Sequence, residues 1–279
     1  MTSIGETFTA TNPVRPGSIV AIGGDEDKSH DMVVLRALLA EAKGAESNVV
    51  VVTTASVEPR RRKREYGNAL NLIGVGDPTF IYINNREQAF NPRVCNKLKG
   101  ANVVFFSGGD QLRLTALIGG TPFLERVREM NKAGMVVGGT SAGGAVLSDL
   151  MVYGGRSDDA AIKGEVVVTR GFRFVDNVAF DTHFLNRGRL PRLFNMVASN
   201  PEILGIGMDE DTAALFRNGG NVFEVVGRGH VTVVDGAHVK SDYHVVERGE
   251  TATFDNLNVH TLSAGDCFDI RKKAPVPRP

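Results

Sequence analysis

The sequence contains no tryptophan, only two cysteines and no excess of charge of either sign. Cys95 and Cys267 lie far apart and form no CxxC pair, so neither a disulfide framework nor a cysteine-rich metal site is expected. Lysine plus arginine equals aspartate plus glutamate at 32 each, which argues against nucleic acid as the main partner. No apolar run approaches the roughly 20 residues of a membrane span, and the polar first residues lack the apolar core of a secretory signal. We therefore expect a cytoplasmic protein without a metal or cofactor that binds neither membrane nor nucleic acid.

Apolar residues and glycine are plentiful, with 42% hydrophobic residues and 32 glycines among 279 residues. Strand-like and helix-like runs alternate along the first two thirds of the chain. Strands are expected at 18–22, 48–53, 79–83, 102–106 and 135–137, and helices at 30–43, 61–73, 92–99, 111–118 and 123–132. This order predicts an α/β fold, a three-layer sandwich whose mostly parallel sheet is buried on both faces.

Beyond about residue 203, short strands alternate with glycine turns such as Gly219-Gly220 and Asp235-Gly236. This pattern is typical of antiparallel hairpins, and it predicts a C-terminal antiparallel extension of the same unit. No linker-like segment interrupts the chain. We expect a single domain over residues 17–271, with flexible tails at 1–16 and 272–279.

The most informative motif is the glycine-rich run at 138–144, which contains Gly139-x-Ser141-x-Gly143. A strand-like run, 135–137, leads into it, and a helix-like run, 142–150, leads out. This is the context of a nucleophile elbow, in which the turn is too tight for side chains beside the serine. The backbone N–H of Ala142 would then face a developing oxyanion. The alternative is a glycine-rich structural turn.

A second glycine pair follows the strand ending at Phe106, in Ser107-Gly108-Gly109-Asp110-Gln111. Glycines at the carboxyl end of a strand allow the backbone to approach a ligand closely. We expect Gly109 or Asp110 to supply a second oxyanion donor and Gln111, at the start of the next helix, to bind substrate. An ordinary turn between strand and helix is the alternative.

His183 comes just after the apolar run 178–180, where a general base is well placed. The acidic run Asp209-Glu210-Asp211 ends another apolar run, and a carboxylate there would orient the imidazole and stabilise its charged form. The alternatives are a structural histidine and surface acids at the end of a strand.

After the histidine come three arginines within a span of six residues, Arg187, Arg189 and Arg192, interrupted by a glycine and a proline. Because guanidinium groups bind carboxylates through a bidentate fork, these residues predict a carboxylate-binding rim, with solvated surface as the alternative. The stronger basic run, 60–64, is expected to be a solvated helix face or to attract an anionic partner. The turn at 23–27 is typical of a ligand-facing loop, but its pattern indicates no specific role.

Together these motifs resemble the cyanophycinases, serine peptidases related to aspartyl dipeptidase (peptidase E). The matching segments are Gly23-Gly24 with Glu26-Asp27-Lys28, 108–114, 139–143, Asp181 with His183-Phe184, Arg187, Arg189, Arg192-Leu193, and 205–207 followed by 209–213. The resemblance implies a fold like that of the class I glutamine amidotransferases, with Ser141 as nucleophile, His183 as base and Glu210 as acid. It places Gln111, Asp181, Arg187, Arg189 and Arg192 at substrate-binding positions. Thr182 departs from the family, which has glutamine there, and its shorter side chain loses one amide contact with the substrate.

The resemblance also implies an activity: hydrolysis of cyanophycin (multi-L-arginyl-poly-L-aspartate), a polyaspartate with arginine on its β-carboxylates, to β-Asp-Arg dipeptides by a homodimer. An aspartyl or isoaspartyl dipeptidase on the same scaffold is the nearest alternative. A non-catalytic polymer-binding protein is a third hypothesis. A glutamine amidotransferase is disfavoured, because its nucleophile is cysteine and this elbow carries Ser141.

Overall fold

The computed structural model describes residues 15–155 and 162–277. Its first sheet is built around five parallel strands, and each of the five expected strands is present. Their order across the sheet is β1 (Ile19–Ile22), β5 (Val136–Thr140), β4 (Val103–Phe106), β2 (Val49–Val52) and β3 (Thr79–Ile81). The α/β class predicted from the alternating pattern is therefore confirmed.

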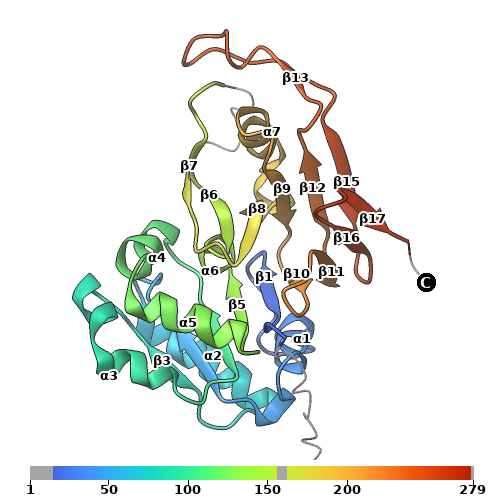
Figure 1. Ribbon diagram of the computed structural model, residues 1–279. Coiled ribbons are helices and arrows are strands. Elements are labelled where there is room, and N and C mark those ends of the chain that lie inside the picture. The colour runs from blue at the N-terminus through green and yellow to red at the C-terminus, as the bar shows by residue number, and fades with distance from the viewer. Residues whose placement is uncertain (1–14, 156–161, 278–279) are drawn as a thin grey trace, which may run out of the picture.

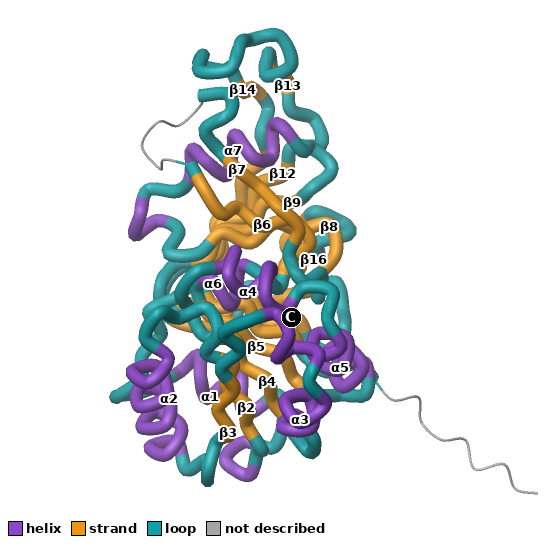
Figure 2. The backbone as a smooth tube through the Cα atoms, turned by 90° about the vertical axis from the view of Figure 1, so that its left-hand side faces the viewer, coloured by secondary structure: helices purple, strands orange, loops and turns teal. Residues whose placement is uncertain are grey.

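Helices cover both faces of these strands (Figures 1 and 2). On one face lie α1 (Val33–Ala40) and α2 (Pro59–Ile73); on the other lie α3 (Pro92–Cys95), α4 (Gln111–Ile118), α5 (Pro122–Lys132) and α6 (Ala142–Ala145). Single 3₁₀ turns occur at Gly44–Glu46, Arg86–Phe90, Asn96–Leu98 and Leu185–Arg187. In β2, Val49 and Val51 pack in one hydrophobic cluster, whereas Val50 and Val52 pack in the other. Because neighbouring side chains of a strand point to opposite faces, a continuous apolar run suits a sheet covered twice.

Antiparallel strands extend the first sheet beyond β1: β10 (Thr212–Phe216), β11 (Val222–Gly227), β16 (Cys267–Asp269) and β17 (Ala274–Val276). The expected flexible tail at 272–279 is wrong for Ala274–Val276, which pairs with β16. Pro275 is tolerated because β17 is the edge strand, where one row of N–H groups has no partner strand. The rest of the tail predictions, at 1–14 and 278–279, lie outside the described residues.

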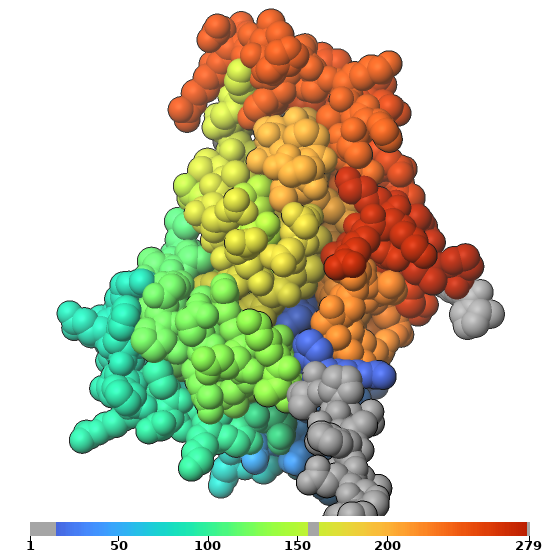
Figure 3. All heavy atoms as spheres, viewed as in Figure 1, coloured from blue at the N-terminus to red at the C-terminus, as the bar shows by residue number. Residues whose placement is uncertain are grey.

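A second sheet, which the sequence pattern did not separate from the first, has the order β15-β12-β9-β8-β6-β7. Its strands are β15 (Asn258–Leu262), β12 (Val231–Asp235), β9 (Leu204–Met208), β8 (Val175–Asp181), β6 (Ser148–Gly154) and β7 (Val167–Arg170). Helix α7 (Leu190–Ser199) packs on β9 and β12, and β13 (Lys240–Ser241) and β14 (Phe254–Asp255) form a short hairpin. The predicted C-terminal extension is therefore divided between two sheets, and Figure 3 shows its orange and red atoms packed against the yellow segment that includes β8.

The expected helix-like run at 142–150 is wrong in its second half. Helix α6 ends at Ala145, and β6 begins at Ser148. Two glycines weaken the short helix, and Val152 and Tyr153 favour a strand. The hydroxyl of Ser148 lies within hydrogen-bond distance of the carbonyls of Ala145 and Leu150 and donates its one proton to either, which stabilises the change of direction.

The two sheets meet at the carboxyl ends of their parallel strands. Within the first sheet, the N–H of Ser141, after β5, donates to the carbonyl of Ile22 in β1 at 3.0 Å. Between the sheets, the N–H of His183, after β8, donates to the carbonyl of Gly23, after β1, at 2.7 Å. Loops at the carboxyl ends of strands are the usual ligand site of open α/β sheets. Within residues 15–155 and 162–277, no helix is long and apolar enough to cross a bilayer.

Candidate active site

Ser141 lies in a strained turn between β5 and α6, as the elbow motif predicts. Its φ is 53° and its ψ is −119°, a conformation that a non-glycine residue rarely adopts. A Cβ on Gly139 would come within 2.0 Å of the Gly143 carbonyl oxygen, and one on Gly143 within 2.0 Å of that of Phe106. Both glycines of the motif are therefore required by close backbone contacts, and the turn exposes the serine hydroxyl.

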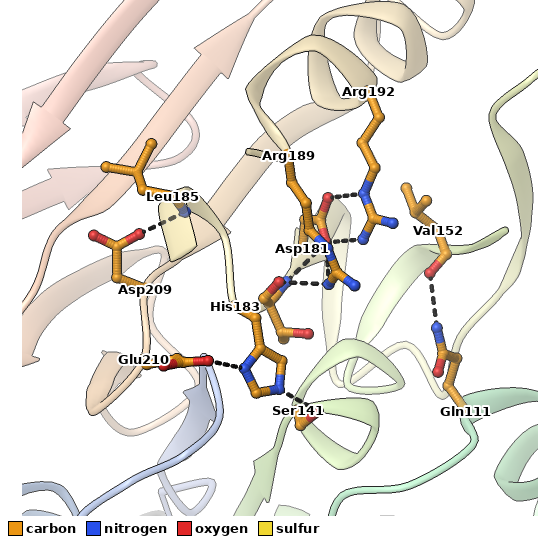
Figure 4. A network of polar contacts seen from close by, with 11 residues as sticks. Gln111, Ser141, Val152, Asp181, His183, Leu185, Arg189, Arg192, Asp209 and Glu210 are labelled. Atoms are coloured by element: carbon orange, nitrogen blue, oxygen red, sulfur yellow. Dashed lines mark hydrogen bonds and ion pairs between the residues drawn. The ribbon is translucent and has the colours of Figure 1, made fainter. Parts of the chain in front are cut away.

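The imidazole of His183 joins this hydroxyl to a carboxylate (Figure 4). Its Nε2 lies 2.9 Å from Ser141 Oγ, and its Nδ1 lies 2.7 Å from Glu210 Oε1. A carboxylate can only accept at Nδ1, so Nδ1 carries the proton and Nε2 is left to accept the serine proton. Burial lowers the pKa of His183, with the hydrogen bond from Nδ1 to Glu210 opposing it. The ring is therefore neutral near pH 7, the form that a general base requires.

The loop after β1 holds the histidine in place, which the sequence pattern did not indicate. The carbonyl of Gly23 accepts the N–H of His183, and a Cβ on Gly24 would lie 2.4 Å from the imidazole ring. Gly24 has a φ of 110°. These glycines let the backbone approach the ring closely. The glycine pair is therefore the sequence feature that could have indicated this contact with the histidine.

Of the three acids after β9, Glu210 alone reaches the histidine ring. The Asp209 carboxylate accepts from the N–H groups of Leu185 and His230, at 3.0 and 3.1 Å. Asp211 accepts from the N–H of Asp27 at 3.0 Å. These two aspartates therefore tie loops together, and they are matched controls for any test of Glu210.

Gly109 lines the cavity in front of Ser141, and Ala142 directly follows Ser141, so both stay candidate oxyanion donors, whereas Asp110 does not. The N–H of Asp110 donates to the carbonyl of Ala55 at 2.9 Å, and its side chain caps α4. The prediction of Asp110 as an oxyanion donor is therefore wrong, because another bond takes its proton. Ala142 opens α6, where N–H groups have no partner in their own helix. The glycine loop is close to the nucleophile, since a Cβ on Gly108 would lie 3.1 Å from Ser141 Cβ.

The predicted arginine rim divides into two parts. Arg192 and Arg189 both point at Asp181, which is 2% exposed (Figure 4). Arg192 Nε donates to Asp181 Oδ2 at 2.6 Å, and Arg189 Nη1 lies 3.3 Å from Oδ1. Burial lowers the pKa of Arg189 to about 10, with Asp181 opposing that shift. Arg187, by contrast, lines the cavity in front of Ser141.

The other two predicted substrate-binding residues flank this network. Thr182 donates its N–H to Asp181 at 2.9 Å, and its carbonyl accepts from Arg189 at 2.6 Å. Gln111 Nε2 donates to the carbonyl of Val152 at 3.1 Å. Gln111 is therefore held at the start of α4 against β6, and its amide oxygen makes no hydrogen bond with the described part of the chain.

The nucleophile opens onto a cavity of about 400 Å³ whose lining carries both signs of charge. Its titratable lining residues are Asp25, Glu26, Lys28, Arg62, Tyr66, His183, Arg187 and Glu210. The sequence pattern indicates no role for the first three, and it places Arg62 in the basic run 60–64. A slightly larger cavity, about 490 Å³, opens beside Ile19 at the opposite end of β1, away from this chemistry. Among the described residues, no group of three or more metal-ligating side chains is arranged to hold a metal ion.

Comparison with known proteins gives relatives along most of the chain. The cyanophycinase of Synechococcus elongatus is 38% identical over 257 residues, covering 91% of this chain and 80% of that protein. The cyanophycinase of Geminocystis herdmanii (strain PCC 6308) is 34% identical over 261 residues, covering 93% and 96%.

Two solved structures are similar in fold. A peptidase from an acI-B1 Actinobacterium has a TM-score of 0.70 at 22% identity, covering 92% of this chain and 98% of its own. A putative peptidase E protein from Listeria monocytogenes EGD-e has a TM-score of 0.52 at 15% identity, covering 76% and 98%. The model of peptidase family S51 matches residues 19–224. The chain therefore belongs to peptidase family S51.

Proposed function

We propose that this protein is a serine-type hydrolase that cleaves cyanophycin to β-Asp-Arg dipeptides. The observation that carries the proposal is the chain of hydrogen bonds from Ser141 through His183 to Glu210, which opens onto a cavity lined by both cations and carboxylates. The substrate has the matching character, because each arginine branch bears a guanidinium and a free carboxylate. Relatives named cyanophycinase, at 34% to 38% identity, support the same substrate.

In the mechanism that we propose, Ser141 Oγ attacks a backbone carbonyl of the polymer while His183 Nε2 takes its proton. The N–H groups of Ala142 and Gly109 stabilise the oxyanion. His183 then protonates the leaving amine, and the acyl-enzyme is hydrolysed by water that His183 activates. Glu210 holds the ring and stabilises its charged form.

We propose that the three arginines do not all bind substrate carboxylates in the same way. Arg187, in the cavity lining, is the candidate for direct contact with a substrate carboxylate. Arg189 and Arg192 form an ion-pair network with the buried Asp181, and this network holds the loop after β8 in its conformation. We still predict that these three residues, together with Gln111 and Thr182, contact the substrate. A homodimer and a cytoplasmic location also remain predictions.

The test is comparative turnover of purified protein on cyanophycin, on unbranched polyaspartate and on α- and β-linked aspartyl dipeptides. We expect β-Asp-Arg from cyanophycin and a preference of roughly 10³-fold or more over polyaspartate, because charged groups in the cavity lose their partners when the branch is missing. Ser141→Ala is the blank for contaminating peptidases. Efficient cleavage of an aspartyl dipeptide with cyanophycin untouched would establish the dipeptidase instead. Binding of the polymer without turnover by wild-type protein would establish a binding protein.

A further inference from the structure

One wall of the cavity carries charged residues outside the proposed machinery. Asp25 and Lys28 follow β1, and Arg62 lies on α2, so all three belong to the first sheet and its helices. Arg187 instead comes from the loop after β8 of the second sheet. The cavity therefore has cations on two walls built from different sheets.

A buried carboxylate fixes Lys28 on the first wall. Glu26 is 2% exposed, and it accepts from Tyr66 Oη at 2.6 Å and from the hydroxyl of Thr140, the residue before the nucleophile. Lys28 Nζ donates to the Glu26 carbonyl at 2.8 Å and lies 3.1 Å from Glu26 Oε1. An ammonium has three donors, so two are used here and a third is left for a ligand in the cavity.

Arg62 is also only partly satisfied. Its Nη1 donates to Glu65 at 2.8 Å, whereas its Nη2 makes no hydrogen bond with a described residue. Its Nε is buried and closed to a ligand, so Nη2 is the free donor for a carboxylate in the cavity that Arg62 lines. The neighbouring Arg61 provides a contrast, because it pairs with Glu58 and Glu65 on the exposed surface of the same helix.

Asp25 supplies the opposite charge on the same wall. It lines the cavity, is exposed and has a φ of 45°. Within the described residues no hydrogen bond or ion pair of its carboxylate is recorded. Its carboxylate is therefore free to accept from a guanidinium, while Lys28 and Arg62 offer donors to a carboxylate.

We propose that Asp25, Lys28 and Arg62 form a second arginine-branch subsite, which binds the substrate branch on the side of the scissile bond opposite to the branch that Arg187 holds. Asp25 binds the guanidinium, and the two cations bind the carboxylate of the same branch. The inference rests on the proposed function, since cleavage within a branched polymer places one branch on each side of the bond.

The experiment pairs each variant with a substrate that lacks the group in question. Three polymers are compared by kcat/KM: cyanophycin, the same backbone with agmatine branches, which have no carboxylate, and one with citrulline branches, which have no positive charge. The variants are Arg62→Gln and Asp25→Asn, with Arg61→Gln as the matched control on the same helix. We expect Arg62→Gln to lower kcat/KM on cyanophycin by about 10-fold or more, mainly through KM, but to change it little on the agmatine polymer. Likewise, Asp25→Asn should lower kcat/KM on cyanophycin but change it little on the citrulline polymer.

The outcomes separate the two proposals. If wild-type protein does not cleave cyanophycin, the proposed function fails. If wild-type protein cleaves it but Arg62→Gln matches Arg61→Gln, or if each variant loses equally on all three polymers, the second subsite is refuted. Lys28→Met, provided that it stays folded despite the loss of the Glu26 partner, should likewise lower kcat/KM more on cyanophycin than on the agmatine polymer, and an equal loss on both would count against the subsite.

Discussion

Replacing Glu210 by glutamine removes the charge beside His183 while preserving the shape of the side chain. The contact is short, with 2.7 Å between Nδ1 and Oε1, but the Glu210 side chain is 30% exposed, so water partly compensates for the lost charge. A glutamine can also donate to Nδ1, which favours the tautomer whose Nε2 cannot accept the serine proton. We expect kcat to fall by roughly 10² to 10⁴, or about 2.7 to 5.4 kcal/mol of transition-state stabilisation at 1.36 kcal/mol per tenfold.

The pH dependence gives a second measurement on the same variant. Burial already lowers the pKa of His183 below its usual 6.5, and Glu210 raises it. Because the neutral ring is the base, kcat/KM of the wild-type protein should rise with pH through a value below 6.5 and then level off. Loss of the carboxylate removes a group that favours the charged ring, so the acid limb should move to lower pH in Glu210→Gln.

The assay is steady-state release of β-Asp-Arg from cyanophycin between pH 4 and 9, with Asp209→Asn and Asp211→Asn as controls. These two residues accept hydrogen bonds from backbone N–H groups, so the substitutions should lower the unfolding temperature but change kcat little. The reasoning is refuted if either control, still folded, loses more kcat than Glu210→Gln. It is also refuted if the acid limb of Glu210→Gln moves upward.

Three further changes test other parts of the site. Ser141→Ala should lower kcat by on the order of 10⁴ to 10⁶ with an unchanged unfolding temperature, and retention of a tenth of wild-type activity would disprove the nucleophile. Arg192→Met should destabilise the fold by about 3 to 5 kcal/mol in urea unfolding, because it leaves the buried Asp181 carboxylate without its main partner; a loss under 1 kcal/mol would contradict this. Gly109→Ala should lower kcat strongly, since its φ is 149° and the new Cβ would lie 2.2 Å from the Ala55 carbonyl oxygen, displacing an oxyanion donor; unchanged kcat would show that the loop is not part of the hole.

Local pattern was enough to predict the parallel core and the tight turn at Ser141. Each central strand is a short apolar run between turn signals, and α4 begins and ends at the predicted residues 111 and 118. The elbow was recognisable because Gly139 is required by a contact within one turn, with the carbonyl of Gly143. That contact joins residues close in sequence, so the sequence carries its signature directly, whereas Gly143 is required by the distant carbonyl of Phe106.

The sequence could not distinguish one of three adjacent acids as the partner of His183 on its own pattern, and the family resemblance pointed to Glu210. In the structure, that choice follows from the register of the turn after β9, where Asp209 and Asp211 face backbone N–H groups of distant loops. Likewise the sequence offered both Gly109 and Asp110 as donors, and the bond from the Asp110 N–H to Ala55 leaves Gly109 as the candidate.

The sequence by itself determined the α/β core, the elbow at Ser141, the position of His183 and a resemblance that spans the chain. Tertiary structure alone decided that the late strands divide between two sheets. It also decided that Arg189 and Arg192 pair with Asp181, whereas Arg187 lines the cavity. Lys28 and Arg62 line the same cavity. The physical reason is distance along the chain. Hydrophobic period and turn chemistry act over a few residues, whereas a charged side chain chooses among partners that only folding brings within reach.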